Sequence, residues 1–318
     1  MVGLHYEALL LFFSLGILGK SAEVVVESAS KLTKFFGISQ MALGFLLVST
    51  LTSLPELTVS VIAASSGNIG ISIGNVIGAN ITNICMVMGI VAIMKGVKIK
   101  KEDYLEIATI MFLTSIIALV LLLIGEFGSI IGAVLIGIFV YYGWKMLKRK
   151  KIAGNGINDV NKPEALNAFV KLIVSIFIVL MSANVAVNAV KQISTISGLD
   201  QTFIGATIVS LGTTLPELMV SIIAVSSGNP ALAIGTAIGS CMTNITLILG
   251  FGILSSTTVV NIPIYTTLVI FLLSANITFF FIAATERKLE TKSGIALIML
   301  YLLFIIVSSG VQISELVP

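Results

Sequence analysis

Apolar runs of about 18 to 25 residues follow one another along the whole chain, separated by shorter polar segments. A helix of that length crosses a hydrocarbon core roughly 30 Å thick. The pattern predicts ten membrane-spanning helices. They cover residues 6–29, 39–64, 71–94, 105–124 and 129–147 in the first half, and 165–190, 200–225, 232–254, 263–284 and 294–312 in the second.

Composition supports this prediction. Of the 318 residues, 57% are hydrophobic and only 10% are charged. The mean hydropathy of +1.12 excludes a soluble globular protein. We therefore expect a multi-pass protein of the cell membrane, whose surroundings are the lipid bilayer.

One segment of the chain occurs twice. Residues 37–89 recur 161 positions later as residues 198–250, and 26 of the 53 aligned positions are identical. Each half contains one copy and five predicted spans, and an odd number of spans means that the second copy enters the membrane from the opposite side. We predict an all-α membrane protein built from two inverted repeats, 1–147 and 165–318, joined by a cytoplasmic linker at 148–164.

The basic residues indicate the orientation independently. Sixteen of the eighteen lysines and arginines fall in or beside alternate connections between the predicted spans. Cytoplasmic connections are enriched in these residues, so the crowded side is predicted to be cytoplasmic and both termini extracellular. The basic run Lys148–Lys151 then belongs to a cytoplasmic flank, and no nucleic-acid partner is expected.

Two acidic residues lie well inside predicted spans, and they occupy equivalent positions of the repeat. These are Glu56 and Glu217. An ionised carboxylate in hydrocarbon costs several kcal/mol, so such residues usually face a polar cavity and mark an ion or proton route. The alternative is a structural hydrogen bond to a neighbouring helix.

Hydroxyl groups surround both glutamates at helical spacing. One helix face carries Ser49, Thr52, Ser53, Glu56 and Ser60, and the second copy repeats it with Ser210, Thr213, Thr214, Glu217 and Ser221. Pro55 and Pro216 precede the glutamates and predict broken helices near the membrane midplane, as in transporters built from inverted repeats. A simple packing kink is the alternative.

The following span of each copy adds an amide. Asn83 and Asn244 are repeat equivalents, and each could bring a neutral oxygen close to the glutamates. Ser240 lies on the same helix face as Asn244. Glycine pairs at 74 and 78 and at 235 and 239 are spaced to let helix backbones approach closely.

Carboxylate, hydroxyl and amide oxygens suit hard cations such as sodium and calcium. Two carboxylates about 5 Å apart repel by roughly 3 kcal/mol at an effective dielectric constant near 20. One divalent ion, two monovalent ions or two protons would each neutralise the pair. Mutually exclusive occupancy of one site is therefore a physical basis for exchange.

The doubled TSLPEL and TTLPEL segments, with the glycine- and asparagine-containing segments that follow them, closely resemble the calcium/cation antiporter superfamily, in its prokaryotic sodium/calcium exchanger branch. The resemblance covers nearly all ten spans and implies alternating access, with the first span of each half sliding across an ion-binding core. It implies that Glu56 and Glu217 bind calcium with oxygens of Thr52 and Thr213. It further implies that Ser49, Ser210 and Ser240 complete flanking sodium sites, and that Asn83 and Asn244 line the centre.

The chain departs from the family pattern at three positions. Leu51 replaces a glycine that the second copy keeps as Gly212, and Ala79 replaces a serine that the second copy keeps as Ser240. One sodium site could therefore lack a ligand. Asn244 stands where potassium-dependent relatives have aspartate, and its neutrality argues against potassium dependence.

These features predict a secondary transporter that exchanges sodium for calcium, with those two ions as cargo, no cofactor and function as a monomer. Calcium/proton exchange is the nearest alternative, because paired carboxylates also bind protons. A cation channel is a second alternative, and it would need no counter-ion. An enzyme is not expected, because the repeated site contains no histidine, catalytic dyad or soft-metal cluster.

Overall fold

The computed structural model describes residues 2–67, 69–98, 101–124, 128–148, 160–196, 210–255, 263–286 and 288–316. Within these ranges the chain is almost entirely helical, which confirms the all-α prediction. The described part contains two short strands, β1 (Val97–Lys98) and β2 (Lys288–Leu289), which pair antiparallel and connect the two halves. Most of the predicted linker, residues 149–159, lies outside the described residues.

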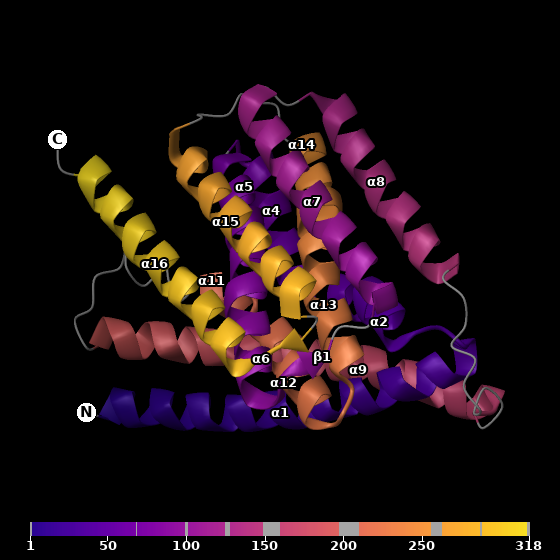
Figure 1. Ribbon diagram of the computed structural model, residues 1–318. Helices are drawn as coiled ribbons and strands as arrows, with labels where there is room; N and C mark the ends of the chain where they lie inside the picture. Colours follow the sequence, from indigo (N-terminus) through magenta and orange to yellow (C-terminus); the bar gives the residue numbers. More distant parts are fainter. Residues whose placement is uncertain are drawn as a thin grey trace.

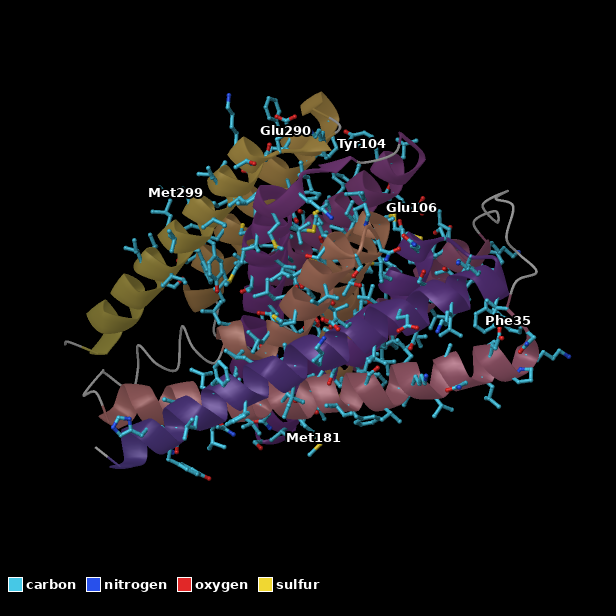
Figure 2. The ribbon with its side chains drawn as sticks, turned by 90° about the horizontal axis from the view of Figure 1, so that it is seen from below. Phe35, Tyr104, Glu106, Met181, Glu290 and Met299 are labelled. Carbon is cyan, nitrogen blue, oxygen red and sulfur yellow. The ribbon has the colours of Figure 1, made fainter. Side chains whose placement is uncertain are left out.

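Two long helices, α1 (Val2–Phe36) and α9 (Lys162–Ile196), begin the two halves. Each has 35 residues and is therefore about 52 Å long, so a bilayer can contain it only if it is strongly tilted. The two helices pack side by side along one face of the bundle and run in opposite directions (Figure 1). Figure 2 shows the same pair from below, with Met181 of α9 pointing away from the bundle. Opposite directions are what inverted repeats require of equivalent helices.

The repeated segments form the centre of the molecule. In the first copy the elements are α2 (Gln40–Leu43), η1 (Gly44–Val48), α3 (Ser49–Thr52), α4 (Leu54–Ser65), α5 (Ile69–Ile81), η2 (Thr82–Val87) and α6 (Met88–Lys95). In the second they are α11 (Ser210–Thr213), α12 (Leu215–Ser226), α13 (Pro230–Met242), η4 (Thr243–Ile248) and α14 (Leu249–Ser255). Four further helices, α7 (Lys101–Ile124), α8 (Ser129–Lys148), α15 (Pro263–Glu286) and α16 (Thr291–Leu316), pack around them (Figure 1).

The number of spans agrees in part with the prediction. Among the described residues, eight helices are long and apolar enough to cross a membrane, or nine if the bent pair Gln40–Thr52 and Leu54–Ser65 counts as one span. The predicted span 200–225 is described only from Ser210 onward, where α12 is a shorter apolar helix. The count of ten therefore stays a prediction.

Both glutamate-bearing helices are interrupted just before the Leu-Pro-Glu sequence. Helix α3 ends at Thr52 and α4 begins at Leu54, with a bend of 48° between the two parts. Ser53, between them, has φ −83° and ψ 13°, and Thr214 in the second copy has φ −88° and ψ 2°. Proline has no backbone N–H and is best tolerated in the first turn of a helix, so each helix restarts around it. The depth of these breaks in a membrane stays a prediction.

The next long helix after each glutamate-bearing helix contains a π-helical segment at the same place of the repeat, η2 after α5 and η4 after α13. Asn83 lies in η2 and Asn244 in η4, so both repeat-equivalent asparagines are on π-helical backbone. Such segments are rare and occur frequently at functional sites. The sequence pattern did not predict them.

Glycine allows close packing in the second copy of the repeat but not at Gly74 in the first. A Cβ atom on Gly239 would lie 2.5 Å from the Cα atom of Phe45 and 2.7 Å from Oγ of Ser49. A Cβ atom on Gly74 would meet nothing within 4 Å, so the predicted close approach at Gly74 is wrong. The tight contact is between α13 and η1.

We expect Gly239→Ala to destabilise the protein by about 1–3 kcal/mol, because the added methyl group collides with backbone that cannot move away. Thermal unfolding in detergent measures the effect. Gly74→Ala is the matched control, and we expect it to be neutral or slightly stabilising, because alanine favours helix and the space is open. Equal melting temperatures of the two variants would contradict this account of the packing.

Candidate ion-binding site

The two glutamates of the repeat are completely buried at the centre of the molecule. Glu56 lies in the first turn of α4 and Glu217 in the first turn of α12, and both residues are 0% exposed. They are close enough to interact electrostatically. Among the described residues, none of the ion pairs involves either glutamate. The centre therefore contains two acidic groups without a basic partner from the described part of the chain.

One carboxylate oxygen of Glu217 is bound by hydroxyl groups from both halves. Ser53 Oγ donates to Glu217 Oε1 over 3.0 Å, and Ser240 Oγ is 3.3 Å from the same oxygen. The two serine hydroxyls are 3.2 Å apart. Ser53 comes from the break before α4 and Ser240 from α13, so this contact brings together three separate elements.

Two threonines are arranged reciprocally about the glutamates. Thr52 interacts with Glu217, and Thr213 interacts with Glu56. The Thr213 contact does not have the geometry of a full hydrogen bond, because both carboxylate oxygens of Glu56 are without a hydrogen-bond partner. Thr52 also donates within its own helix, to the carbonyl oxygens of Val48 at 3.0 Å and Ser49 at 3.2 Å. Each half thus brings a threonine to the glutamate of the other half.

The other predicted site residues differ in their contacts and in whether the structure describes their side chains. Ser49 is buried, donates to the carbonyl oxygen of Phe45, and packs against Gly239. Ser210 begins α11, but its side chain lies outside the described part of the structure. Asn83 and Asn244 are both fully buried, and Asn244 donates its Nδ2 to Oδ1 of Asn80 over 3.0 Å.

Several buried oxygens of this group have no hydrogen-bond partner. They are both carboxylate oxygens of Glu56, Oε2 of Glu217, Oδ1 of Asn83 and Oδ1 of Asn244. A buried polar atom without a partner costs about 1–3 kcal/mol, and more when it carries charge. A cation bound by such atoms would supply the partner that they lack. The donor set is oxygen only, and it fits a hard ion such as sodium or calcium as transported cargo.

Two residues at the site were missing from the predicted ligand set. The sequence pattern places Ser53 on the hydroxyl face but does not assign it as a ligand, although it donates to Glu217. Asn80 lies off the predicted polar face of its helix, so the pattern does not point to it. Its repeat partner is Cys241 rather than a second asparagine, so the internal comparison gave no signal.

Comparison with known proteins places these features in a family. The family model described as "Sodium/calcium exchanger protein" matches residues 6–147 and 167–310. The sodium/calcium exchanger MaX1 of Methanosarcina acetivorans is 29% identical over 94% of this chain and 97% of its own length. The uncharacterized membrane protein MJ0091 of Methanocaldococcus jannaschii is 32% identical over 74% of this chain and 78% of its length.

Solved structures of the sodium-calcium exchanger NCX_Mj have the same fold. One of them, soaked with zero Na⁺ and Ca²⁺, superposes with a TM-score of 0.84 at 27% identity, and covers 95% of this chain and 98% of that one. Another, soaked with 2.5 mM Na⁺ and 0.1 mM Ca²⁺, has a TM-score of 0.82 at 26% identity over 94% of this chain and 97% of that one. The family match over both halves, the full-length relative and the shared fold agree. This chain belongs to the sodium/calcium exchanger family, in its prokaryotic branch.

Proposed function

We propose that this protein exchanges sodium for calcium across the cell membrane by alternating access, with both ions competing for the site between Glu56 and Glu217. The observation that carries the proposal is the group of buried oxygens without partners around two unpaired carboxylates. Protein groups leave these oxygens unsatisfied, whereas one calcium ion or two sodium ions would neutralise the pair. The same oxygens cannot bind calcium and two sodium ions together, because the additional ions would bring excess positive charge into a buried site.

The ligands divide between the two ions. Calcium is held by Glu56 and Glu217 with help from Thr52 and Thr213, and the amide oxygens of Asn83 and Asn244 line the centre. Flanking sodium sites use Ser49, Ser210 and Ser240. The contact of Ser240 and Ser53 with Glu217 supports a site beside that carboxylate. In the first half Ala79 supplies no hydroxyl at the equivalent position.

The cycle follows from the arrangement of the two long helices. Helices α1 and α9 pack mainly against each other, and α1 contacts α12 of the core. We infer that the pair slides as a unit across the core and opens the site to one side of the membrane at a time. The inferred topology has ten spans in two inverted repeats, 1–147 and 165–318, with both termini outside and one chain as the functional unit.

The charge balance makes the cycle electrogenic and independent of potassium. If three sodium ions exchange for one calcium ion, one net charge crosses per cycle, and its coupling to voltage is about 2.3 kcal/mol per 100 mV. Because the side chain of Asn244 is neutral, the centre carries about two negative charges. Sodium or calcium balances these charges without a potassium ion. MaX1 and NCX_Mj are both named sodium/calcium exchangers, and NCX_Mj was soaked with sodium together with calcium or strontium. These facts support exchange of sodium and calcium by this protein.

Calcium flux into proteoliposomes tests the function. We expect calcium uptake to require sodium on the opposite side of the membrane, to be unaffected by replacing external potassium with choline, and to respond to an imposed voltage. Uptake driven equally well by a pH gradient without sodium would indicate calcium/proton exchange instead. Uptake that needs no counter-ion would indicate a channel.

A further inference from the structure

The amide of Asn244 is held by an asparagine that lies outside the proposed set of ligands. Nδ2 of Asn244, in η4, donates to Oδ1 of Asn80, in α5, over 3.0 Å. Nδ2 of Asn80 in turn donates to the backbone carbonyl of Cys241, in α13, over 3.0 Å. All three residues are fully buried, so water does not compete for these bonds.

A backbone carbonyl sets the direction of this series of hydrogen bonds. A carbonyl oxygen can only accept, so Asn80 must present its amide nitrogen to Cys241. The amide oxygen of Asn80 then faces Asn244, which has to offer its own nitrogen in return. The remaining atom, Oδ1 of Asn244, is buried and has no hydrogen-bond partner. It is one of the oxygens that we assign to the cation site.

We propose that Asn80 is a positioning residue, which fixes the Asn244 amide so that its oxygen rather than its nitrogen is available to the transported cation. The inference rests on the proposed function of the site. An amide nitrogen carries hydrogens with partial positive charge and repels a cation, so a 180° turn of the Asn244 amide removes one ligand and adds repulsion. Partners that orient metal ligands typically change metal affinity by about 10- to 100-fold when they are mutated.

The first half of the chain lacks the equivalent anchor. Asn80 and Cys241 are 161 residues apart, as are Asn83 and Asn244, so Cys241 is the repeat partner of Asn80. Sγ of Cys241 lies 3.9 Å from the backbone carbonyl oxygen of Asn80. Each of the two side chains therefore contacts the backbone carbonyl of the other residue. A thiol has no amide oxygen to orient Asn83, and both amide atoms of Asn83 are without partners. Only one of the two central asparagines is anchored.

Calorimetric titration of the detergent-solubilised protein with calcium tests the proposal. We expect Asn80→Leu to weaken calcium binding by about tenfold or more. Asn276→Leu is the matched control, because Asn276 is also a buried asparagine but bonds to Ser115 and Met111 of α7 instead. Its calcium affinity should equal that of the unmutated protein. Unchanged affinity in Asn80→Leu would overturn the proposal.

A double mutant separates positioning from a general structural effect. If Asn80 acts through Asn244, then Asn80→Leu causes no further loss of calcium affinity in an Asn244→Ala background. Losses that multiply in the double mutant would overturn the proposal. Thermal unfolding without calcium checks that each variant is folded.

Cys241→Asn provides a gain-of-function test, in which an amide replaces the thiol that contacts the Asn80 carbonyl. The new amide can donate to the carbonyl of Asn80 and accept from Nδ2 of Asn83, which gives the first half the missing anchor. We expect calcium affinity to rise about three- to tenfold, and an unchanged or lower affinity in the folded variant would contradict the inference. If glutamine variants of Glu56 and Glu217 still bind calcium, the proposed function fails. If they lose binding while Asn80→Leu binds normally, only the positioning role fails.

Discussion

Replacing Glu56 by glutamine is expected to abolish calcium binding and sodium-driven calcium transport. Both carboxylate oxygens of Glu56 are buried without hydrogen-bond partners, and glutamine would place an NH₂ group at one of these two positions. A divalent ion would then face one carboxylate instead of two. Removing one of two oppositely charged partners in a buried site, here the carboxylate that faces the calcium ion, costs about 3–5 kcal/mol. This corresponds to roughly a hundredfold or more in calcium affinity.

Glu217→Gln should have a similar effect for a related reason. Oε1 of Glu217 already accepts from Ser53 and lies near Ser240, while Oε2 has no partner. The glutamine oxygen can keep the serine contacts, but the amide nitrogen then occupies the position of Oε2. Calorimetry measures the loss of affinity directly. The calcium-induced rise in melting temperature should also disappear, because a ligand stabilises only the state that binds it.

Glu106→Gln is the matched control for both variants. Glu106 is also a buried carboxylate, but it forms an ion pair with Lys145 at 3.1 Å, between α7 and α8. Its replacement should leave calcium affinity unchanged and alter only the stability of the protein. Normal calcium affinity in both Glu56→Gln and Glu217→Gln would refute a shared site at the centre of the two repeats.

The repeat was the part of the sequence from which the burial of the two glutamates could be predicted. Glu56 and Glu217 are identical, equivalent and in apolar surroundings, so their burial at a common centre follows from the cost of placing charge in lipid. The packing of α1 against α9, by contrast, depends on contacts between halves that no local pattern encodes. Periodicity predicted the spans 6–29 and 165–190, but it did not predict that each continues into a helix of 35 residues.

Local backbone details could not be predicted in the same way. The π-helical segments that carry Asn83 and Asn244 depend on tertiary packing, because one extra residue per turn changes neither composition nor hydrophobic pattern enough to detect. Glycine pairs gave a correct indication at Gly239 and a wrong one at Gly74, since identical spacing does not determine which helix face meets a neighbour. Asn80 was missed because its role comes from a hydrogen bond to Asn244, 164 residues away.

Asn244→Asp is expected to make calcium binding release about one more proton than it does in the unmutated protein. The substitution adds a third carboxylate to a buried site whose two carboxylates one calcium ion already neutralises. A unit charge about 5 Å from a divalent ion gains roughly 6–7 kcal/mol at an effective dielectric constant near 20. Without the ion the same carboxylate faces the desolvation penalty and the repulsion of two acids, so it takes up a proton. Calcium then displaces that proton.

Calorimetry in buffers with different ionisation enthalpies counts the protons, and calcium flux in the variant should also acquire a dependence on pH. Without calcium the protonated carboxyl can donate its O–H to Oδ1 of Asn80 in place of the amide. Once calcium has displaced that proton, Asn80 must either face a negative charge or give up its bond to the Cys241 carbonyl. Asn276→Asp adds a carboxylate elsewhere in the core and should leave the number of released protons unchanged. An Asn244→Asp variant with the original proton count and the original sodium, potassium and calcium profiles would show that position 244 does not contact the transported ions.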